Sequence, residues 1–264
     1  MNLSLSRPPL TVDRLTVQFT TPTDERLTAL GPLSFQVKQG EFVCVLGPSG
    51  CGKSTLVRVL AGLLRPSLGS ALLYGQPILD PSAQVGMMFQ DASLLPWRTV
   101  LDNIALPLEL QGVNHSEREA QAARLLPMLK LEGYARFYPS QLSGGMRQRV
   151  ALGRLLIQQP QVLLLDEPFG ALDALTRETL RADLLRVWAE YRQTVVMVTH
   201  DIHEAVLLAD RVIVLTRRPG RISEEIEITF SRPRLPDLVY STAFGTVAQR
   251  IRAAIDTASE TLPS

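Results

Sequence analysis

Residues 47–55 read Gly47-Pro48-Ser49-Gly50-Cys51-Gly52-Lys53-Ser54-Thr55, and this stretch decides the fold class. It fits the phosphate-binding pattern of Gly, any four residues, Gly, Lys and Ser or Thr. The apolar runs Phe42–Leu46 and Leu56–Ala61 flank it, so the glycines are expected between a buried strand and a helix N-terminus. That context predicts a nucleoside triphosphate site. The alternative is a glycine-rich turn that matches by chance, which average residue usage allows in about one chain per hundred of this length.

Each part of the phosphate loop has an expected role. Backbone N–H groups of residues 50–55 can point at the phosphates, where a helix N-terminus also favours negative charge. Lys53 supplies a cation, and the Ser54 hydroxyl supplies a ligand for Mg²⁺. Cys51 is close to Lys53 and to the helix N-terminus, and both features lower the pKa of a thiol. We therefore expect Cys51 among the phosphate-binding amides, with a lowered pKa.

Length and composition are those of an ordinary globular protein. The chain has 264 residues, of which 45% are hydrophobic, enough for one large domain or one domain with a lobe. Its 27 Lys and Arg nearly balance 26 Asp and Glu, so charge gives no reason to expect nucleic acid as a partner. No apolar run approaches the roughly 18 residues that cross a bilayer, and residues 1–9 lack the apolar core of a signal peptide. We expect a cytosolic protein whose two cysteines, Cys44 and Cys51, are free thiols.

Apolar patterning predicts an α/β domain with a mostly parallel sheet. Residues 15–19 and 33–37 alternate like half-exposed strands around the polar turn 20–26, which predicts an antiparallel flap. A helical pattern over 99–130 predicts an inserted lobe at about residues 91–150. Further segments are predicted as strands (70–74, 85–89, 162–165, 194–198 and 211–215) and as a helix (about 175–191).

The chain after residue 230 is predicted to follow the main domain, which spans residues 10–230. Residues 231–236 have the composition of a linker. Apolar residues then recur at helical spacing and predict an amphipathic helix within a segment over 231–264: Phe244, Val247, Ile251, Ile255 and Ala258.

Two adjacent acids end one of the predicted strands. Asp166 and Glu167 follow the apolar run Val162–Leu165, and the C-terminal edge of a parallel sheet is where phosphate-binding loops lie. Asp166 could hold Mg²⁺ through water, and Glu167 could activate water as a general base. Without a phosphate loop, a solvated strand end would be an equally good interpretation.

Gln90 and His200 each follow a predicted strand. The Gln90 amide can coordinate Mg²⁺ or water and so report whether a γ-phosphate is present. A lone Gln is more often a surface residue and a lone His more often structural. The order of the other motifs favours the functional interpretation of both.

The run Leu142-Ser143-Gly144-Gly145-Met146 separates the classes of phosphate-loop protein. Ser143, Gly144 and Gly145 present a hydroxyl and unhindered backbone donors at the start of a predicted helix over 146–158. This is a second anion-binding site in the same chain, and one nucleotide cannot plausibly occupy both.

With Gln90, Val162–Pro168, Ala171-Leu172-Asp173 and His200, this run resembles the ATP-binding subunit of an ABC transporter. The resemblance extends from about Leu10 to Arg221, with all motifs in the family's order. It implies a P-loop NTPase of the ABC type: a mostly parallel core sheet, an antiparallel β flap and an inserted α-helical lobe.

The resemblance also implies how the sites work. Two subunits would pack head to tail, so that each Ser143–Gly145 motif caps the ATP in the partner's phosphate loop, with Asp173 at the interface. His200 would contact the γ-phosphate and orient the attack, and Glu167 would be the general base. Phe19 would stack on adenine, a contact worth about 1 kcal/mol. A strand Phe in the core is the alternative.

The loop Leu94-Leu95-Pro96-Trp97-Arg98-Thr99 forms an apolar patch that a soluble monomer would normally cover. In ABC importers this region receives a helix of the membrane permease. The alternative is that Trp97 lies under the helical lobe. Together with Pro219–Ile222 and Arg232–Arg234, this loop resembles the nitrate, sulfonate and taurine branch of importer ATPases.

That branch implies an ATP- and Mg²⁺-dependent subunit on the cytoplasmic face of the cell membrane. Its partners would be a second copy, a transmembrane permease and, indirectly, an external solute-binding protein, with no nucleic acid. Relatives in the branch also serve bicarbonate, cyanate-like anions or thiamine precursors. The alternative from another class is a soluble ABC ATPase of DNA repair or translation. A phosphoryl-transfer kinase would leave Leu142–Met146 unexplained.

Overall fold

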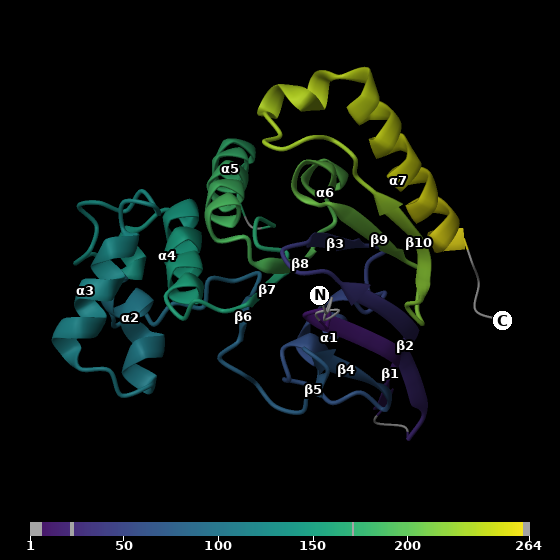
Figure 1. Ribbon diagram of the computed structural model, residues 1–264, viewed down its shortest axis with the longest axis horizontal. Helices are drawn as coiled ribbons and strands as arrows, with labels where there is room; N and C mark the ends of the chain where they lie inside the picture. The colour runs from purple at the N-terminus through teal and green to yellow at the C-terminus, as the bar shows by residue number, and fades with distance from the viewer. Residues whose placement is uncertain (1–6, 22–23, 171, 261–264) are drawn as a thin grey trace, which may run out of the picture. The chain divides into compact units, whose positions relative to one another are not determined.

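The computed structural model describes residues 7–21, 24–170 and 172–260, which form two compact units (Figure 1). Unit 1 is built from the chain up to Ser82 and from Gln193 onward, and unit 2 is Ala83–Arg192. Parts of the predictions lie outside the described residues: 1–6 of the N-terminal segment, Pro22 and Thr23 of the turn, Ala171, and 261–264.

The main sheet of unit 1 holds the strands β10 (Ile222–Glu227), β9 (Arg211–Leu215), β3 (Phe42–Leu46) and β8 (Thr194–Val198) in that order. Strand β3 runs parallel to both β9 and β8, and β10 pairs antiparallel with β9. Every residue of β3 and β8 is buried, as their continuous apolar sequences predict. Because β3, β8 and β9 are parallel, their C-terminal ends meet at one edge of the sheet.

A second sheet of unit 1 is antiparallel and has the order β2 (Arg26–Val37), β1 (Leu10–Thr20), β4 (Leu68–Leu73) and β5 (Gln76–Pro77). It is larger than the predicted flap because β1 and β2 pair along their whole length, from Leu10 with Val37 to Thr20 with Arg26. Strand β4 corresponds to the predicted strand 70–74.

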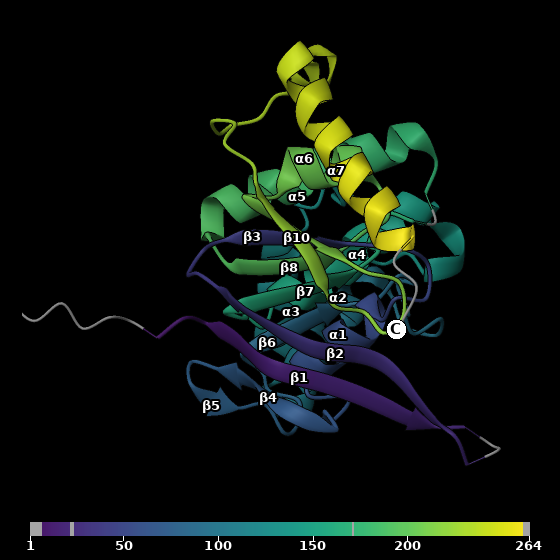
Figure 2. The same ribbon diagram turned by 90° about the vertical axis from the view of Figure 1, so that its right-hand side faces the viewer.

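The helices of unit 1 cover both faces of its main sheet. Helices α6 (Ile202–Leu208) and α7 (Thr242–Glu260) lie together over β3, β9 and β10, and α1 (Lys53–Leu60) lies on the opposite face with the antiparallel sheet (Figures 1 and 2). A short 3-10 helix, η2 (Pro236–Tyr240), precedes α7. Of the apolar residues predicted to form one face of α7, three are fully buried (Phe244, Ile251 and Ala258).

Unit 2 pairs two parallel strands, β6 (Val85–Met88) and β7 (Val162–Asp166), and adds four α-helices and a 3-10 helix. These are α2 (Val100–Leu110), α3 (His115–Leu125), η1 (Pro139–Gln141), α4 (Gly144–Leu156) and α5 (Ala174–Tyr191). The helical pattern over 99–130 therefore corresponds to the two helices α2 and α3. The break follows from local sequence: Gly112 has φ +80°, and the Asn114 side chain accepts the N–H of Glu117 to begin α3.

The predicted α/β class, with parallel strands and an antiparallel flap, is confirmed. Within the part of the chain that the structure describes, no helix combines the length and the hydropathy needed to cross a membrane.

Candidate functional site

The phosphate loop connects β3 to α1, as the sequence predicts, and wraps around Lys53. The Lys53 side chain is buried, and its Nζ donates to the carbonyl oxygens of Gly47 and Pro48 at 2.9 and 3.1 Å. Gly52 has φ +104°, and a Cβ there would lie 2.5 Å from the side chain of Leu30. Only glycine fits that position without strain, so the loop is built for close backbone approach and not for side-chain packing.

Cys51 points into the protein and not toward a ligand. Its side chain is fully buried, and its Sγ lies 3.9 Å from Lys53 Nζ. Burial raises the pKa of Cys51, although Lys53 acts in the lowering direction. The prediction of a lowered pKa is therefore wrong, because loss of hydration outweighs the nearby cation. Cys44 and Cys51 are both free thiols, as predicted.

His200 lies at the same sheet edge as the phosphate loop. It directly follows β8, and the N–H of the preceding residue, Thr199, donates to Val45 of β3 at 3.3 Å. The His200 side chain is exposed at this edge. Parallel pairing of β3 with β8 thus brings two of the predicted site segments together within unit 1.

The structure also brings Gln90 and Glu167 together, within unit 2. They follow β6 and β7, whose parallel register pairs Met88 with Leu165. Gln90 Nε2 lies 3.4 Å, and Glu167 Oε2 3.5 Å, from the point that a Cβ on Gly170 would occupy. Asp166 is 9% exposed at the end of β7.

Glu167 has an unusual backbone conformation. Its φ is +47°, a left-handed value that costs a non-glycine residue on the order of 1 kcal/mol. Such strain often accompanies a functional position, and here it occurs at the predicted general base.

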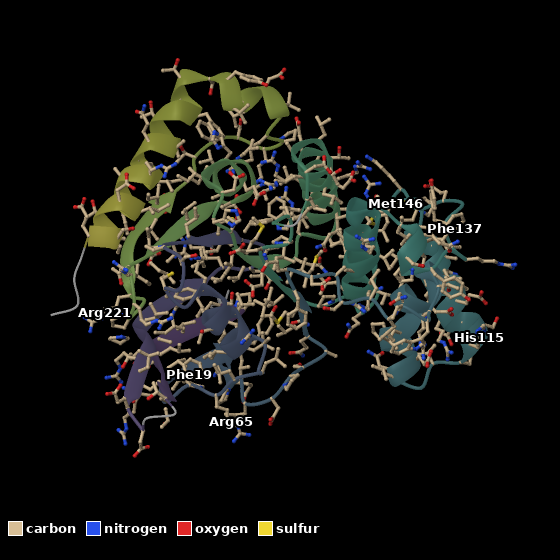
Figure 3. All side chains as sticks on the ribbon, turned by 180° about the vertical axis from the view of Figure 1, so that it is seen from behind. Phe19, Arg65, His115, Phe137, Met146 and Arg221 are labelled. Carbon is tan, nitrogen blue, oxygen red and sulfur yellow. The ribbon has the colours of Figure 1, made fainter. Side chains whose placement is uncertain are left out.

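The run Leu142–Met146, which we call the signature, leads into the start of α4, which contacts the start of α5. The Ser143 hydroxyl caps α4 by accepting the Met146 N–H at 3.2 Å; Figure 3 labels Met146. Asp173 caps α5 by accepting the Thr176 N–H at 3.0 Å, and hydrogen bonds from Thr176 lower the pKa of this carboxyl. A Cβ on Gly145 would lie 2.3 Å from Thr176 Cγ2, so glycine is required where the two helix starts touch.

Comparison with known proteins decides the family. The family model described as ABC transporter matches residues 30–170. The chain belongs to the ABC transporter family. An uncharacterized ABC transporter ATP-binding protein of Methanocaldococcus jannaschii is 50% identical over 209 residues, covering 79% of this chain and 78% of that protein.

Two relatives of this ABC protein carry names that state a substrate. The nitrate import ATP-binding protein NrtD of Synechococcus elongatus is 48% identical, covering 78% of this chain and 76% of that protein. The taurine import ATP-binding protein TauB of Roseobacter denitrificans is 41% identical, covering 84% and 83%. A dimeric ATP-binding cassette in a post-hydrolysis state, bound to ADP and Pi, superposes with a TM-score of 0.74 at 32% identity, over 84% of this chain and 100% of that one.

Sequence reasoning missed the residues that hold the Gln90 loop of this ABC protein to α4. Buried Gln148 donates from Nε2 to the Gln90 carbonyl at 2.9 Å. Arg154 donates to the carbonyls of Ala92 and Ser93 at 2.6 and 3.0 Å. The signature helix and the Gln90 loop are thereby joined by three bonds. The sequence gives only a weak signal for Gln148 and Arg154, because the partner of a polar residue in a predicted helix cannot be read from the sequence.

Arg218 is a second residue that sequence reasoning missed. It follows β9, and its Nε donates to the Gly50 carbonyl of the phosphate loop at 3.3 Å. The adjacent Gly220 exchanges bonds with β2, donating to Ala29 at 3.0 Å and accepting from Gly31 at 3.0 Å. The sequence signal that could have identified Arg218 is its position just after the predicted strand 211–215, which places it at the same sheet edge as the phosphate loop.

The loop Leu94–Thr99 is exposed at its tip and fixed at its base. Trp97 is 70% exposed, which rules out the alternative that it lies under the helical lobe. Fully buried Asn103 accepts the Leu95 N–H at 2.9 Å and donates to the carbonyls of Leu95, Arg98 and Thr99 at 3.1, 3.0 and 3.0 Å. The loop therefore presents a preformed surface.

More aromatic surface lies beside this loop. The N–H groups of Val100 and Leu101 donate to the carbonyls of Phe137 and Ala135 at 2.8 and 3.0 Å, so the segment 134–138 adjoins the start of α2. Three aromatic side chains of this segment are exposed (Tyr134, Phe137 and Tyr138), and Figure 3 labels Phe137.

Phe19, labelled in Figure 3, lies on β1 opposite Leu27 and is 42% exposed. It is therefore not a plain core residue. Its stacking on adenine stays a prediction.

Proposed function

We propose that this chain is the ATP-hydrolysing subunit of an importer for a small anion such as nitrate, a sulfonate or taurine, bound peripherally at the cytoplasmic face of the cell membrane. The observation that carries the proposal is that one chain holds both a phosphate loop, between β3 and α1, and a capped signature at the start of α4. The relatives named for nitrate and taurine import support the substrate class.

ATP binding would use residues 47–55, where backbone N–H groups at the start of α1 favour phosphate. Lys53 already bonds two loop carbonyls, so its ammonium is held at the centre of the loop before a nucleotide arrives. Phe19 would supply a face for adenine from β1.

The donors proposed for Mg²⁺ fit that ion. The Ser54 hydroxyl, the Gln90 amide oxygen and the Asp166 carboxylate are oxygen ligands, which Mg²⁺ prefers. In the described part of the chain no cluster of three or more His, Cys, Asp or Glu could hold a metal alone. That fits Mg²⁺, which binds through few protein ligands together with substrate phosphates. When bound, the ion would neutralise negative charge on the phosphate oxygens.

Glu167 would take the proton of the attacking water, with Gln90 beside it. The left-handed φ of Glu167 and the position of both side chains around Gly170 support these roles. His200 would act from the phosphate-loop edge of unit 1 by contacting the γ-phosphate. A positioned base contributes about 10²–10⁴-fold in rate.

A second copy of the chain would complete the site. Ser143 is exposed at the start of α4, and Asp173 is exposed at the adjacent start of α5, so both can face a partner. In the head-to-tail arrangement, residues 143–145 would cap the ATP of the other copy. The dimeric cassette with ADP and Pi supports this stoichiometry.

The permease would bind the preformed loop Leu94–Thr99. Exposed Trp97 and the adjoining aromatic residues Tyr134 and Phe137 form an apolar surface that fits a helix of a membrane subunit. An external solute-binding protein would deliver the anion to that permease without touching this chain.

The test is reconstitution with the permease and the solute-binding protein of a nitrate or taurine importer. ATP-dependent uptake of nitrate, taurine and an alkanesulfonate into liposomes is measured, with the Glu167→Gln chain as the inactive control. Uptake of one of these anions is expected. If the chain hydrolyses ATP but the permease does not stimulate this hydrolysis and no uptake occurs, the result would favour a soluble ABC ATPase. Uptake of bicarbonate or a thiamine precursor alone would correct the substrate class.

A further inference from the structure

Helix α6 is bonded to both neighbours of His200. On one side, Asp201 Oδ1 caps the helix by accepting the N–H groups of His203 and Glu204 at 2.8 and 3.2 Å. On the other side, Thr199 Oγ1 donates to the buried Glu204 carboxylate at 2.6 Å. The position of α6 therefore sets the backbone position of His200.

Arg234 caps the opposite end of α6 from outside the helix. Its side chain is 1% exposed and lies 3.9 Å from the Asp210 carboxylate. Its hydrogen bonds go to main-chain carbonyls: Val206, Leu207, Ala209, Ile228 and Phe230. The last carbonyls of a helix have no partner within it, and the rigid guanidinium fork can satisfy several at once. Burial, with Arg232 nearby, lowers the pKa of Arg234 to about 10. The buried charge of Arg234 is therefore stabilised by these carbonyls together with the Asp210 carboxylate.

Arg232 extends the same attachment to the start of β3. It donates to the Leu208 carbonyl at 2.6 Å and to Asp210 Oδ1 at 2.7 and 2.9 Å. The other oxygen of Asp210 accepts the N–H of Phe42 at 2.9 Å, and Phe42 begins the strand that leads into the phosphate loop. The end of α6 and the start of β3 are therefore held by one arginine–aspartate pair.

Phe244 packs the start of α7 onto α6. Its ring is 1% exposed and stacks on the His203 ring, with centroids 5.6 Å apart and planes 25° apart. It also stacks on Phe230 at 6.5 Å. At the far end of α7, the Ala258 carbonyl accepts the N–H of Arg217 at 2.9 Å.

We propose that residues 230–244 form a positioning element for His200: they fix both ends of α6, and α6 fixes His200 at the edge where the phosphate loop lies. The proposal rests on the proposed role of His200 toward ATP. Arg232, Arg234 and Phe244 are positioning residues in it. The sequence predicted a linker at residues 231–236, but Arg234 is a buried anchor.

The test measures kcat and KM for ATP of the whole chain with Arg234→Met, Arg234→Lys and Phe244→Leu. The control is Arg252→Met, the same substitution at an exposed position of α7. Each variant is also combined with His200→Ala. In parallel, the ring signals of the three histidines are followed by NMR in isotope-labelled protein, with His115 of α3 as the internal reference.

Arg234→Met is expected to lower kcat by roughly ten- to a hundredfold, the range for a small misplacement of a reacting group, with KM changed less than about twofold. Arg234→Lys should restore part of the rate. The His200 signal should shift while that of His115 stays. In the His200→Ala background, Arg234→Met should lower kcat no further.

Other outcomes would overturn the proposal. If Arg234→Met lowers kcat by the same factor in the His200→Ala background as in the wild-type chain, Arg234 acts on the fold in general and not through His200. An unchanged His200 signal, or unchanged kcat, in Arg234→Met would also refute it; if that variant does not fold, Phe244→Leu gives the same test. If His200→Ala alone hydrolyses ATP at the wild-type rate, the proposed role of His200 fails, whereas the His200 ring signal still reports whether the segment positions that residue.

Discussion

Replacing Asn103 by alanine removes the side chain that fixes the loop Leu94–Thr99. One accepted hydrogen bond is lost, together with the two N–H groups of Nδ2, which share the three carbonyls of Leu95, Arg98 and Thr99. Each hydrogen bond contributes a net 0.5–1.5 kcal/mol as a rough rule, and the loop groups that lose a partner can regain part of it from water. We therefore expect the free energy of unfolding to fall by about 2–4 kcal/mol.

The matched control is Asn114→Ala, which removes the capping bond to the Glu117 N–H and an exposed bond to the Glu117 carboxylate at the start of α3, and should cost about 1 kcal/mol. Urea unfolding gives both free energies. Because Asn103 lies in unit 2 and away from residues 47–55 in sequence, the ATP affinity of the Asn103 variant should be unchanged. The stimulation of its ATPase rate by the permease should fall at least about tenfold. A variant as stable as the control, or one that the permease stimulates normally, would refute the view that Asn103 preforms the docking loop.

Three further predictions concern the nucleotide site. Glu167→Gln should keep ATP affinity and lose about 10²–10⁴-fold in turnover, with an ATP-bound dimer accumulating on gel filtration; near-wild-type turnover would remove Glu167 from the role of base. Lys53→Ala should weaken ATP binding itself, and an unchanged affinity by calorimetry would contradict this role for Lys53. Burial raises the pKa of Cys51, so its thiolate forms only at a pH above the range of an ordinary thiol. At pH 8, iodoacetamide should therefore label Cys51 more slowly in the folded chain than in the unfolded chain, and the labelling rate should increase with pH. Mg-ATP should slow that labelling further, because the nucleotide would cover the phosphate loop. Cys44, which is equally buried but lies inside strand β3 and has a pKa raised well above its ordinary value, should stay unlabelled. Rapid labelling of Cys51 at pH 7 would show that its thiol is exposed.

The elements predicted most accurately from the sequence are those made of consecutive apolar residues. Strand β3 was predicted at the same residues that the structure shows, Phe42–Leu46, because a strand buried on both faces needs every side chain apolar. The motifs then located the loops that follow such strands. Gln90 and Glu167 were each predicted as site residues at a strand end, but that they lie together follows from the parallel pairing of their strands, which only the structure shows.

Elements that are short or polar escaped prediction. Helix α6 has seven residues, too few to show a helical period, and β10 is mostly polar, with Ile222 and Ile226 separated by Ser and Glu. Arg234 follows a proline in a segment that has the composition of a linker, and only tertiary structure shows that it caps α6. The raised pKa of Cys51 could not be predicted because it depends on burial, which overrides the neighbouring Lys53.

The most direct test of the central claim, a site shared between two copies, is to mix two inactive variants. Ser143→Arg places a cation and bulk at the start of α4 and should leave ATP binding intact while abolishing hydrolysis. Lys53→Ala disables the phosphate loop but keeps the signature. A mixture with Lys53→Ala in excess should regain ATPase activity, because a mixed dimer holds one intact site built from the loop of one chain and the signature of the other. Normal hydrolysis by Ser143→Arg alone, or no activity in the mixture, would contradict the head-to-tail site.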